Sequence, residues 1–279
     1  MSGLAIISGR GLLPQLLAEE CAKTDRPYLV VSIAGIELDW SSKHPVYQSE
    51  FEKFGALFAA LHKDKISSVV FAGGVRRPNF DMTRLDEKTK TILPDLAIHM
   101  AGGDGGTLQA VAKIFEAEGF QIEAAHQLLS GLLAPVGALG EFSPSKADFA
   151  DMKRAMEIVT AIGVLDIGQG AVVAQQLCLG VETLQGTDAM LECVAQSKGL
   201  LLPDPNGAKG VLFKGPKPRQ DLRMDMPAVG PHTLENAAKA GLGGVAVVAG
   251  KTLLLNPSET REAADKLGLF LYGTDEASG

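Results

Sequence analysis

The stretch LAIISGRGLLPQLL at residues 4–17 decides the fold of the first half of the chain. It begins with four apolar residues that are typical of a buried β-strand, and a tight Gly-Arg-Gly turn follows at 9–11. After the turn, Leu13, Leu16 and Leu17 recur at the spacing of one helix face. A buried strand that passes through a glycine turn into a helix is the repeating unit of parallel α/β sheets.

Further strand and helix patterns of this kind follow along the chain. Apolar runs predict strands at 28–33 and 68–71, and amphipathic spacing predicts a helix over 54–61. The glycine-rich run at 102–106 opens another helix, which Gly119 is placed to end. These alternating elements predict a Rossmann-like domain with a parallel sheet covered on both faces.

A change in composition marks a second domain. Residues 133–144 are dominated by glycine, alanine and proline, and the helix that follows begins with a Ser145–Asp148 capping box. We therefore expect an N-terminal Rossmann-like domain over 1–134, a linker over 135–144 and a C-terminal α/β catalytic domain over 145–279. Within the second domain, the patterns predict one strand over 171–181 and a hairpin over 245–255.

Composition excludes several classes of protein. The 279 residues are 46% hydrophobic and carry a net charge of −7, which argues against disorder and against a broad nucleic-acid-binding surface. The three cysteines form no CxxC pair, and the five histidines show no metal-ligand spacing. No apolar run is long enough to span a bilayer, and the N-terminus lacks the basic region of a signal peptide. A cytoplasmic protein is expected.

Two glycine turns, at 9–11 and 73–74, are candidate phosphate sites, and the glycine-rich run at 102–106 permits close approach to a ligand or a hinge. A helix that starts after such a turn offers backbone N–H groups to an anion. The alternative for each is a turn without a ligand, and Asp104 could simply cap its helix. Pro14 occupies the position of the third small residue of a dinucleotide fingerprint, so an NAD(P)-dependent oxidoreductase is the weaker interpretation. The GxxxxGK[ST] and GxSxG motifs are absent.

The segment 209–225 concentrates positive charge in an acidic chain. Lys209 and Lys214 suit a phosphorylated substrate, for which they can neutralise a pyrophosphate. Asp221 and Asp225 lie among these cations, and a carboxylate beside phosphate oxygens can hold a divalent cation or orient water. The alternative is a solvated loop with ordinary surface ion pairs.

Six motifs taken together resemble the LpxI-type UDP-2,3-diacylglucosamine pyrophosphatase family of lipid A biosynthesis. They extend through nearly the whole chain in order. The motifs are LAIISGRGLLP at 4–14, FAGGVRRP at 71–78, GGDGG at 102–106, GQG at 168–170, ETLQGTD at 182–188 and DLRMDMPAVG at 221–230.

The resemblance implies an activity and an assembly. Such an enzyme hydrolyses the pyrophosphate of UDP-2,3-diacylglucosamine to UMP and 2,3-diacylglucosamine 1-phosphate (lipid X), with Mg²⁺ as cofactor. It implies a homodimer in which each ligand is enclosed between the two domains. A long-chain substrate lies in a membrane, so we expect peripheral contact with the cytoplasmic face of the inner membrane. The apolar stretches 128–139 and 162–165 are candidates for holding the acyl chains.

The resemblance also implies site residues. Asp225, in the DMP motif, is the expected catalytic residue and a candidate metal ligand, and whether it binds metal or orients water stays open. A non-catalytic carrier of a nucleotide-linked lipid is the main competing hypothesis. The expected substrate-binding residues are Gly11, Leu12, Gly73, Gly74, Asp104, Gln121, Gly168, Gln169, Gly170, Thr187, Lys209 and Lys214.

Overall fold

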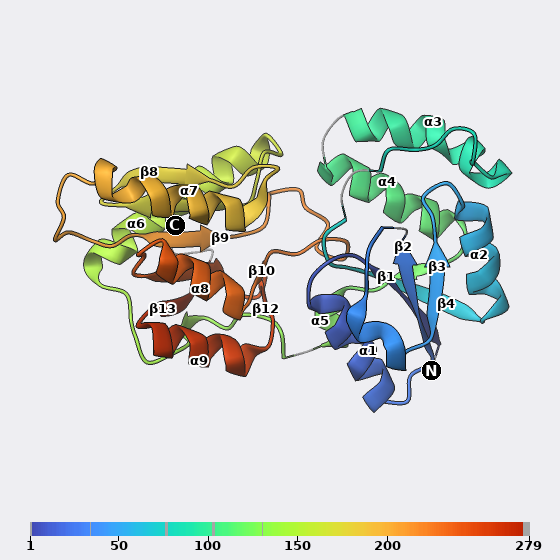
Figure 1. Ribbon diagram of the computed structural model, residues 1–279, viewed down its shortest axis with the longest axis horizontal. Helices are drawn as coiled ribbons and strands as arrows, with labels where there is room; N and C mark the ends of the chain where they lie inside the picture. The colour runs from blue at the N-terminus through green and yellow to red at the C-terminus, as the bar shows by residue number, and fades with distance from the viewer. Residues whose placement is uncertain (1, 34, 76–77, 102–103, 130, 276–279) are drawn as a thin grey trace. The chain divides into compact units, whose positions relative to one another are not determined.

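The chain divides into two compact units in a computed structural model that describes residues 2–33, 35–75, 78–101, 104–129 and 131–275 (Figure 1). Unit 1 comprises Met1–Ser130 together with Asp221–Asp225, and unit 2 comprises Gly131–Gln220 together with Met226–Gly279. The chain therefore passes from one unit to the other three times. Each unit has its own sheet and core, and each is described by itself.

Unit 1 is built on a parallel sheet of five strands in the order β3-β2-β1-β4-β5, which confirms the predicted Rossmann-like fold. Its strands are β1 Gly3–Ser8, β2 Tyr28–Ile33, β3 Val46–Ser49, β4 Ile66–Ala72 and β5 Gln121–Ile122. The helices are α1 Leu13–Lys23, η1 Asp39–Lys43, α2 Phe54–Lys63, α3 Glu87–Ala101, α4 Asp104–Ala117 and α5 Ala125–Leu128.

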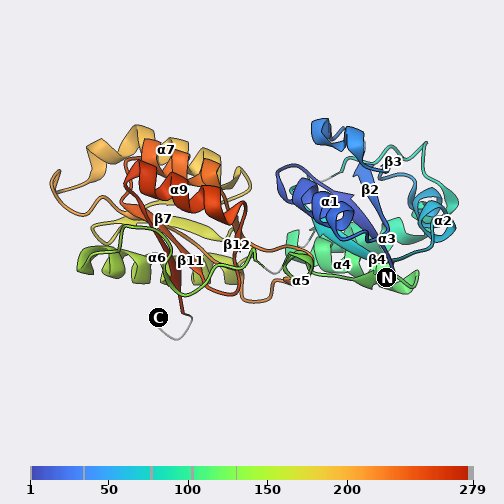
Figure 2. The ribbon, with the colours of Figure 1, turned by 90° about the horizontal axis from the view of Figure 1, so that it is seen from below.

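The helices of unit 1 cover both faces of this sheet, with α1 and α4 on opposite sides (Figure 2). Ala5 and Ile7 of β1 join a core cluster with residues of α2 and α4, because alternate side chains of a strand point to the same face. Phe115 of α4 lies at the centre of this cluster, in edge-to-face contact with Phe58 and Phe71 at centroid distances of 5.2 Å. Such pairs stabilise a core beyond the area that they bury.

The segment Asp221–Asp225 packs on unit 1, although it is distant in sequence. Met224 is 5% exposed and belongs to the same core cluster as Phe115. Arg223 forms an ion pair with Glu116 of α4 at 3.1 Å. The expectation that 145–279 forms one continuous domain is therefore wrong for this segment, since its contacts are with the first unit.

Unit 2 holds a mixed sheet of six strands in the order β6-β13-β11-β9-β7-β8, and β10 and β12 pair separately. The strands are β6 Gly137–Ala138, β7 Gly170–Ala174, β8 Leu177–Val181, β9 Val211–Lys214, β10 Ala228–Val229, β11 Gly244–Val248, β12 Leu253–Leu254 and β13 Phe270–Thr274. The helices are α6 Lys146–Val164, α7 Gly186–Leu201, α8 Pro231–Lys239 and α9 Pro257–Leu267.

Strand alternation divides the core of unit 2 into two layers. Val211 and Phe213 of β9 face α6, whereas Leu212 belongs to the cluster that includes residues of α7, α8 and α9. Figure 2 shows α6 on one side of the sheet and α7 and α9 on the other. A second α/β domain was predicted, and this layered arrangement confirms it.

The linker over 135–144 and the hairpin over 245–255 are two expectations for unit 2 that the structure contradicts. The expected linker 135–144 contains β6, which pairs antiparallel with β13, and a Cβ at Gly273 would lie 1.8 Å from the carbonyl oxygen of Pro135. The break between the units falls at 130/131 instead. The expected hairpin over 245–255 is also wrong, because β12 pairs with β10.

The expected single strand over 171–181 is a hairpin of β7 and β8. The chain turns at Gln175 and Gln176, whose φ values are 52° and 63°. Asp151 of α6 is buried beneath the turn and accepts hydrogen bonds from both backbone N–H groups, at 3.0 and 2.7 Å. These hydrogen bonds stabilise the left-handed backbone conformation of Gln175 and Gln176, which residues other than glycine rarely adopt.

Candidate functional site

Two glycine turns of unit 1 lie together where β1 and β4 end. Arg10 N–H donates to the Gly74 carbonyl at 2.9 Å, and Gly74 N–H donates to the Arg10 carbonyl at 3.0 Å. A Cβ at Gly9 would lie 2.5 Å from the Gly73 carbonyl oxygen, and one at Gly73 would lie 2.4 Å from that of Arg10. These two glycines are therefore required by the mutual approach of the two turns, whether or not a ligand binds.

Gly11 and Leu12 connect this double turn to α1. Gly11 has a φ of +103°, and a Cβ at this position would meet no atom of the described residues within 4 Å. Leu12 is the N-cap of α1 and offers no side-chain hydrogen bond to the helix. An uncapped helix start beside an open glycine can bind an anion. The structure thus brings Gly11, Leu12, Gly73 and Gly74 together, and their contact with substrate stays a prediction.

Gln121, another candidate of unit 1, is not part of this group. Gln121 opens β5 and pairs with Ser68 of β4, five residues before Gly73. At the rise of a β-strand, this separation is about 16 Å along the sheet. Asp104 is the first residue of α4. The glycines at 102 and 103 and the side chain of Asp104 lie outside the described residues.

Asp225 ends the segment that packs on unit 1, and it is half-buried. Its backbone N–H donates to the Asp221 carbonyl at 3.1 Å, so both carboxylates belong to one tight turn. The Asp221 carboxylate accepts from the Arg223 guanidinium at 2.8 and 3.1 Å, and these hydrogen bonds hold the pKa of Asp221 below its ordinary value. Asp221 is thus held in an ion pair with Arg223, and the catalytic role expected for Asp225 stays a prediction.

A preformed metal cage is not found in the described part of the chain, where no three carboxylate, histidine or cysteine side chains gather. This arrangement still fits Mg²⁺, which is commonly bound through one or two carboxylates with substrate phosphates and water as the remaining ligands. Asp225 would be the protein ligand of such an ion.

Unit 2 brings together a second group of candidates at one edge of its sheet. Gly170 of β7 lies opposite Lys214 of β9 in antiparallel register. Lys214 Nζ donates to Thr187 Oγ1 at 2.8 Å, and Gln169 accepts a backbone hydrogen bond from Gly215 at 3.1 Å. The sequence motifs GQG and ETLQGTD and the end of β9 therefore form one polar cluster.

Glu182 is a member of this cluster that was not predicted. Its carboxylate accepts from Thr187 Oγ1 at 2.8 Å and lies 3.8 Å from Lys214 Nζ. An isolated glutamate within a motif gives no sign of burial. The signal that could have revealed it is the pair of glycines at 168 and 170, which indicates that some group approaches the start of the strand closely.

Lys209 does not belong to this cluster, so a shared role with Lys214 in neutralising one pyrophosphate is not supported. It precedes β9 and is exposed, whereas Lys214 ends the same strand. Lys209 lies before the turn at Gly210, whose φ is +92°, and Lys214 lies about 10 Å along β9 from the start of the strand at Val211. The two lysines thus lie at opposite ends of β9.

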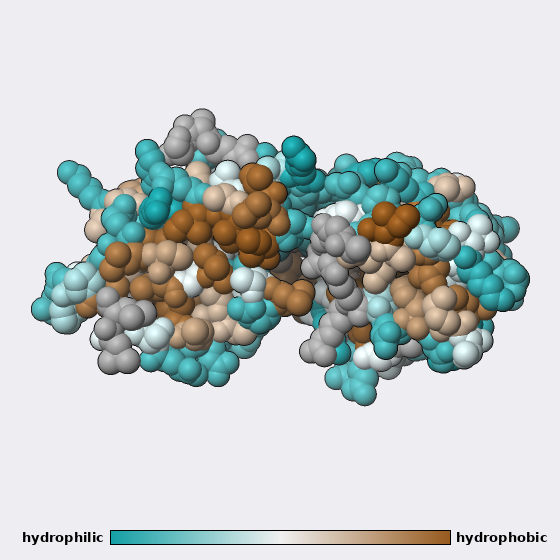
Figure 3. Space-filling view, turned by 90° about the horizontal axis from the view of Figure 1, so that it is seen from above, coloured by the Kyte–Doolittle hydropathy of each residue, from teal (hydrophilic) through white to brown (hydrophobic). Residues whose placement is uncertain are grey.

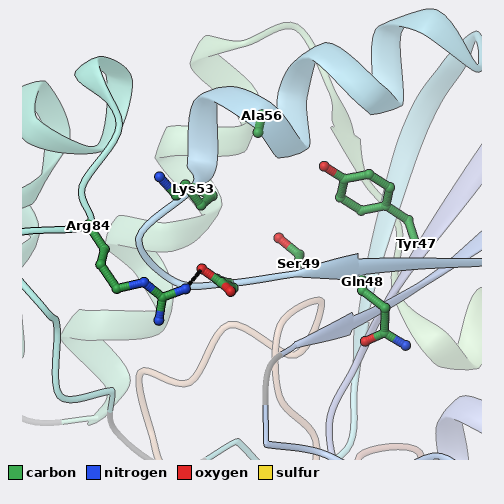
Figure 4. A pocket seen from close by; sticks show the side chains of 7 residues that line it. Tyr47, Gln48, Ser49, Lys53, Ala56 and Arg84 are labelled. Carbon is green, nitrogen blue, oxygen red and sulfur yellow. Dashed lines mark hydrogen bonds and ion pairs between the residues drawn. The ribbon is translucent and has the colours of Figure 1, made fainter.

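A surface cleft of about 540 Å³ lies in unit 1 beside β3 and the start of α2 (Figure 4). Arg84 forms an ion pair with Glu50 across it. The lining side chains are polar for the most part and include none of the predicted site residues. They are Tyr47, Gln48, Ser49, Glu50, Lys53, Ala56 and Arg84.

Apolar side chains gather on the face of unit 2 seen in Figure 3. Val164 and Leu165, in the stretch expected to hold acyl chains, are each 70% exposed. In the stretch 128–139, Leu132 and Ala134 are buried, whereas Val136 is 65% exposed. Over the described residues, every helix is too short or too polar to cross a bilayer. The exposed large apolar residues of unit 2 are Val136, Phe142, Phe149, Val164, Leu165, Ile167, Leu177, Leu184 and Leu267.

Comparison with known proteins agrees with the two units. A family model described as the LpxI N-terminal domain matches residues 3–132, and one described as the LpxI C-terminal domain matches residues 135–272. The chain is 38% identical over 275 residues to the UDP-2,3-diacylglucosamine pyrophosphatase LpxI of Caulobacter vibrioides, which covers 99% of this chain and 98% of that protein. The chain belongs to the LpxI family.

Proposed function

We propose that this protein hydrolyses the pyrophosphate bond of UDP-2,3-diacylglucosamine in lipid A biosynthesis. The observation that carries the proposal is the 38% identity over 99% of the chain to a relative named for this activity. Both LpxI domain models match in their order along the chain, so the similarity is not confined to one unit.

The reaction would release UMP and lipid X through attack of water on one phosphorus atom. Asp225, in the half-buried turn anchored by Met224, would orient that water or bind Mg²⁺. Lys214 would donate N–H groups to phosphate oxygens, since charge neutralisation and positioning provide most of the acceleration in phosphoryl transfer. A bound Mg²⁺ would neutralise further charge on the two phosphates.

The lipid tails of this substrate require an apolar surface. The exposed apolar side chains of unit 2 and the lack of a spanning helix among the described residues support peripheral contact with the inner membrane. Homodimerisation remains a proposal from the family resemblance.

The test is to incubate the purified protein with UDP-2,3-diacylglucosamine and Mg²⁺ and to follow UMP and lipid X by mass spectrometry. We expect Asp225→Asn to reduce turnover at least a hundredfold, in line with the loss of a positioned acid–base or charge-stabilising group. Asp39→Asn, at an exposed carboxylate of η1, is the matched control and should leave turnover unchanged.

Two outcomes would contradict this assignment. Tight binding of the substrate with no product over hours would favour a carrier of nucleotide-linked lipid. Normal turnover by a folded Asp225→Asn protein would remove Asp225 from the mechanism. Hydrolysis in ¹⁸O-labelled water, with the label traced to UMP or to lipid X, then identifies the phosphorus that is attacked.

A further inference from the structure

The side chains of Lys214, Thr187 and Glu182 form a hydrogen-bonded chain in unit 2. Lys214 Nζ donates to Thr187 Oγ1 at 2.8 Å, and Thr187 Oγ1 donates to Glu182 Oε1 at 2.8 Å. The side chains of Lys214 and Glu182 are only 9% and 10% exposed. The ammonium nitrogen and the carboxylate oxygen are 3.8 Å apart, so the threonine hydroxyl joins them in place of a direct hydrogen bond.

This arrangement is poorly suited to stability alone. Glu182 Oε2 is buried with no hydrogen-bond partner in the described residues. Lys214 uses one of its three N–H donors in the network, and no acceptor among the described residues takes the other two. A buried ion pair with incomplete hydrogen bonding costs more than it returns. Buried polar groups that lack hydrogen-bond partners are expected at sites where a bound ligand provides the missing hydrogen bonds.

The backbone around Glu182 holds its carboxylate in one place. A Cβ at Gly168 would lie 1.9 Å from the Glu182 carbonyl oxygen, and a Cβ at Gly170 would lie 2.6 Å from Glu182 Oε2. Glu182 N–H also donates to the Gly170 carbonyl at 2.8 Å. The two glycines of the GQG motif therefore form the slot for Glu182, and no larger residue could occupy either position without moving it.

The direction of the hydrogen bonds follows from this fixed carboxylate. A carboxylate only accepts, so the Thr187 hydroxyl hydrogen must point to Glu182. The hydroxyl oxygen then presents its lone pairs to Lys214, which fixes the position of the ammonium group.

We propose that Glu182 is a positioning residue that acts through Thr187 to aim the two remaining N–H groups of Lys214 at phosphate oxygens of the substrate. The inference rests on the proposed function for the identity of that substrate. It goes beyond that proposal, because it assigns a role to Glu182 and explains why Gly168 and Gly170 must lack side chains.

A double-mutant cycle separates positioning from a purely structural role. We expect Glu182→Gln to lower kcat/KM tenfold to a hundredfold in the natural background. In a Lys214→Met background, the same substitution should change kcat/KM less than twofold, because the group through which it acts is gone. Glu192→Gln, at an exposed carboxylate of the same helix as Thr187, is the control for removing a carboxylate.

Thr187 provides a test that keeps both charges in place. Thr187→Ser retains the hydroxyl and should keep kcat/KM within threefold, whereas Thr187→Val keeps the shape and should lose at least tenfold. Lys214→Met leaves a buried carboxylate without its partner and is expected to destabilise unit 2. The double variant Glu182→Gln/Lys214→Met removes both charges and should recover part of that stability.

A readout without turnover uses inorganic pyrophosphate with Mg²⁺ as the probe. Acetylation of Lys214, followed by peptide mass spectrometry, should be slowed by the probe in the natural protein and in Thr187→Ser, but not in Thr187→Val. Lys209, before the other end of β9, is the internal reference for the rate of acetylation.

The inference is overturned if Glu182→Gln has the same effect with and without Lys214, or if Thr187→Ser and Thr187→Val behave alike. Should the natural protein not hydrolyse UDP-2,3-diacylglucosamine, the proposed function fails, and acetylation alone decides the inference. Protection of Lys214 would then support an anion-positioning network that serves another phosphate ester. A lack of protection in the natural protein would overturn the network as well.

Discussion

Replacing Met224 with alanine is expected to release the segment Asp221–Asp225 from unit 1. Met224 is 5% exposed and lies in the phenylalanine-rich core, whereas the Arg223–Glu116 ion pair that also holds the segment is about half exposed on both sides. Exposed ion pairs contribute little to stability. Truncation of a buried methionine to alanine costs about 2–5 kcal/mol. The free energy required to open the segment should fall by a similar amount.

This loss is measurable by native-state hydrogen exchange. A decrease of about 2–5 kcal/mol in opening free energy accelerates exchange of the Met224 and Asp225 amides roughly thirtyfold to several-thousandfold. Leu57→Ala in α2 removes a side chain from the same core and is the matched control. It should lower the stability of unit 1 as a whole without selective exchange in the segment. Equal acceleration of the segment and the sheet in Met224→Ala would refute the idea that Met224 is a local anchor.

Three further results are expected. The hydrogen bond from Arg26 lowers the pKa of Glu123 below 4.5, so the stability that this pair provides is complete above about pH 4.5 and disappears as the pH falls through the lowered pKa. Urea midpoints measured between pH 6 and pH 3 should show this decline, and Glu123→Gln should flatten it. Gly168→Ala would place a methyl group 1.9 Å from the Glu182 carbonyl oxygen, which should cost about 1–3 kcal/mol or more and lower the melting temperature. Calorimetry should detect Mg²⁺ binding only with UMP or pyrophosphate present, and Asp225→Asn should weaken it; tight binding of Mg²⁺ alone would contradict a site completed by phosphate.

The first half of the fold could be predicted because its signals are local. The run 4–17 contains most of a strand, a turn and the start of a helix, and the same order of patterns recurs at later positions. Since parallel strands need crossover connections, this order leaves few arrangements other than a covered parallel sheet. The structure confirms that prediction in the order β3-β2-β1-β4-β5.

Other features depend on contacts between distant residues, and a sequence pattern does not show them. The turn at Gln175–Gln176 lacks glycine, asparagine and proline, and it depends on Asp151, more than twenty residues earlier. The segment Asp221–Asp225 joins unit 1 through Met224, which in the sequence is a single apolar residue between Arg223 and Asp225. In both places the deciding partner lies in another element.

The predicted site residues divide in the same way. Gly11, Leu12, Gly73 and Gly74 were expected at one edge of a parallel sheet, because the carboxyl ends of neighbouring parallel strands lie together. Lys209 and Lys214 were grouped only because they are near each other in sequence. The structure places Lys209 before β9 and Lys214 at its end, so a joint role for the two lysines stays a prediction.

Glycine is where the functional interpretation needs the structure most. A glycine turn indicates that some atom approaches the backbone closely, but that atom can belong to a ligand or to the protein itself. At Gly73 and Gly168 it belongs to the protein, since a Cβ would meet a backbone oxygen at 2.4 and 1.9 Å. At Gly11 and Gly74, a Cβ would meet nothing in the described residues within 4 Å. Substitution of Gly74 by alanine should therefore leave unit 1 folded and weaken only nucleotide binding, whereas the same change at Gly73 should destabilise the turn before any ligand is added.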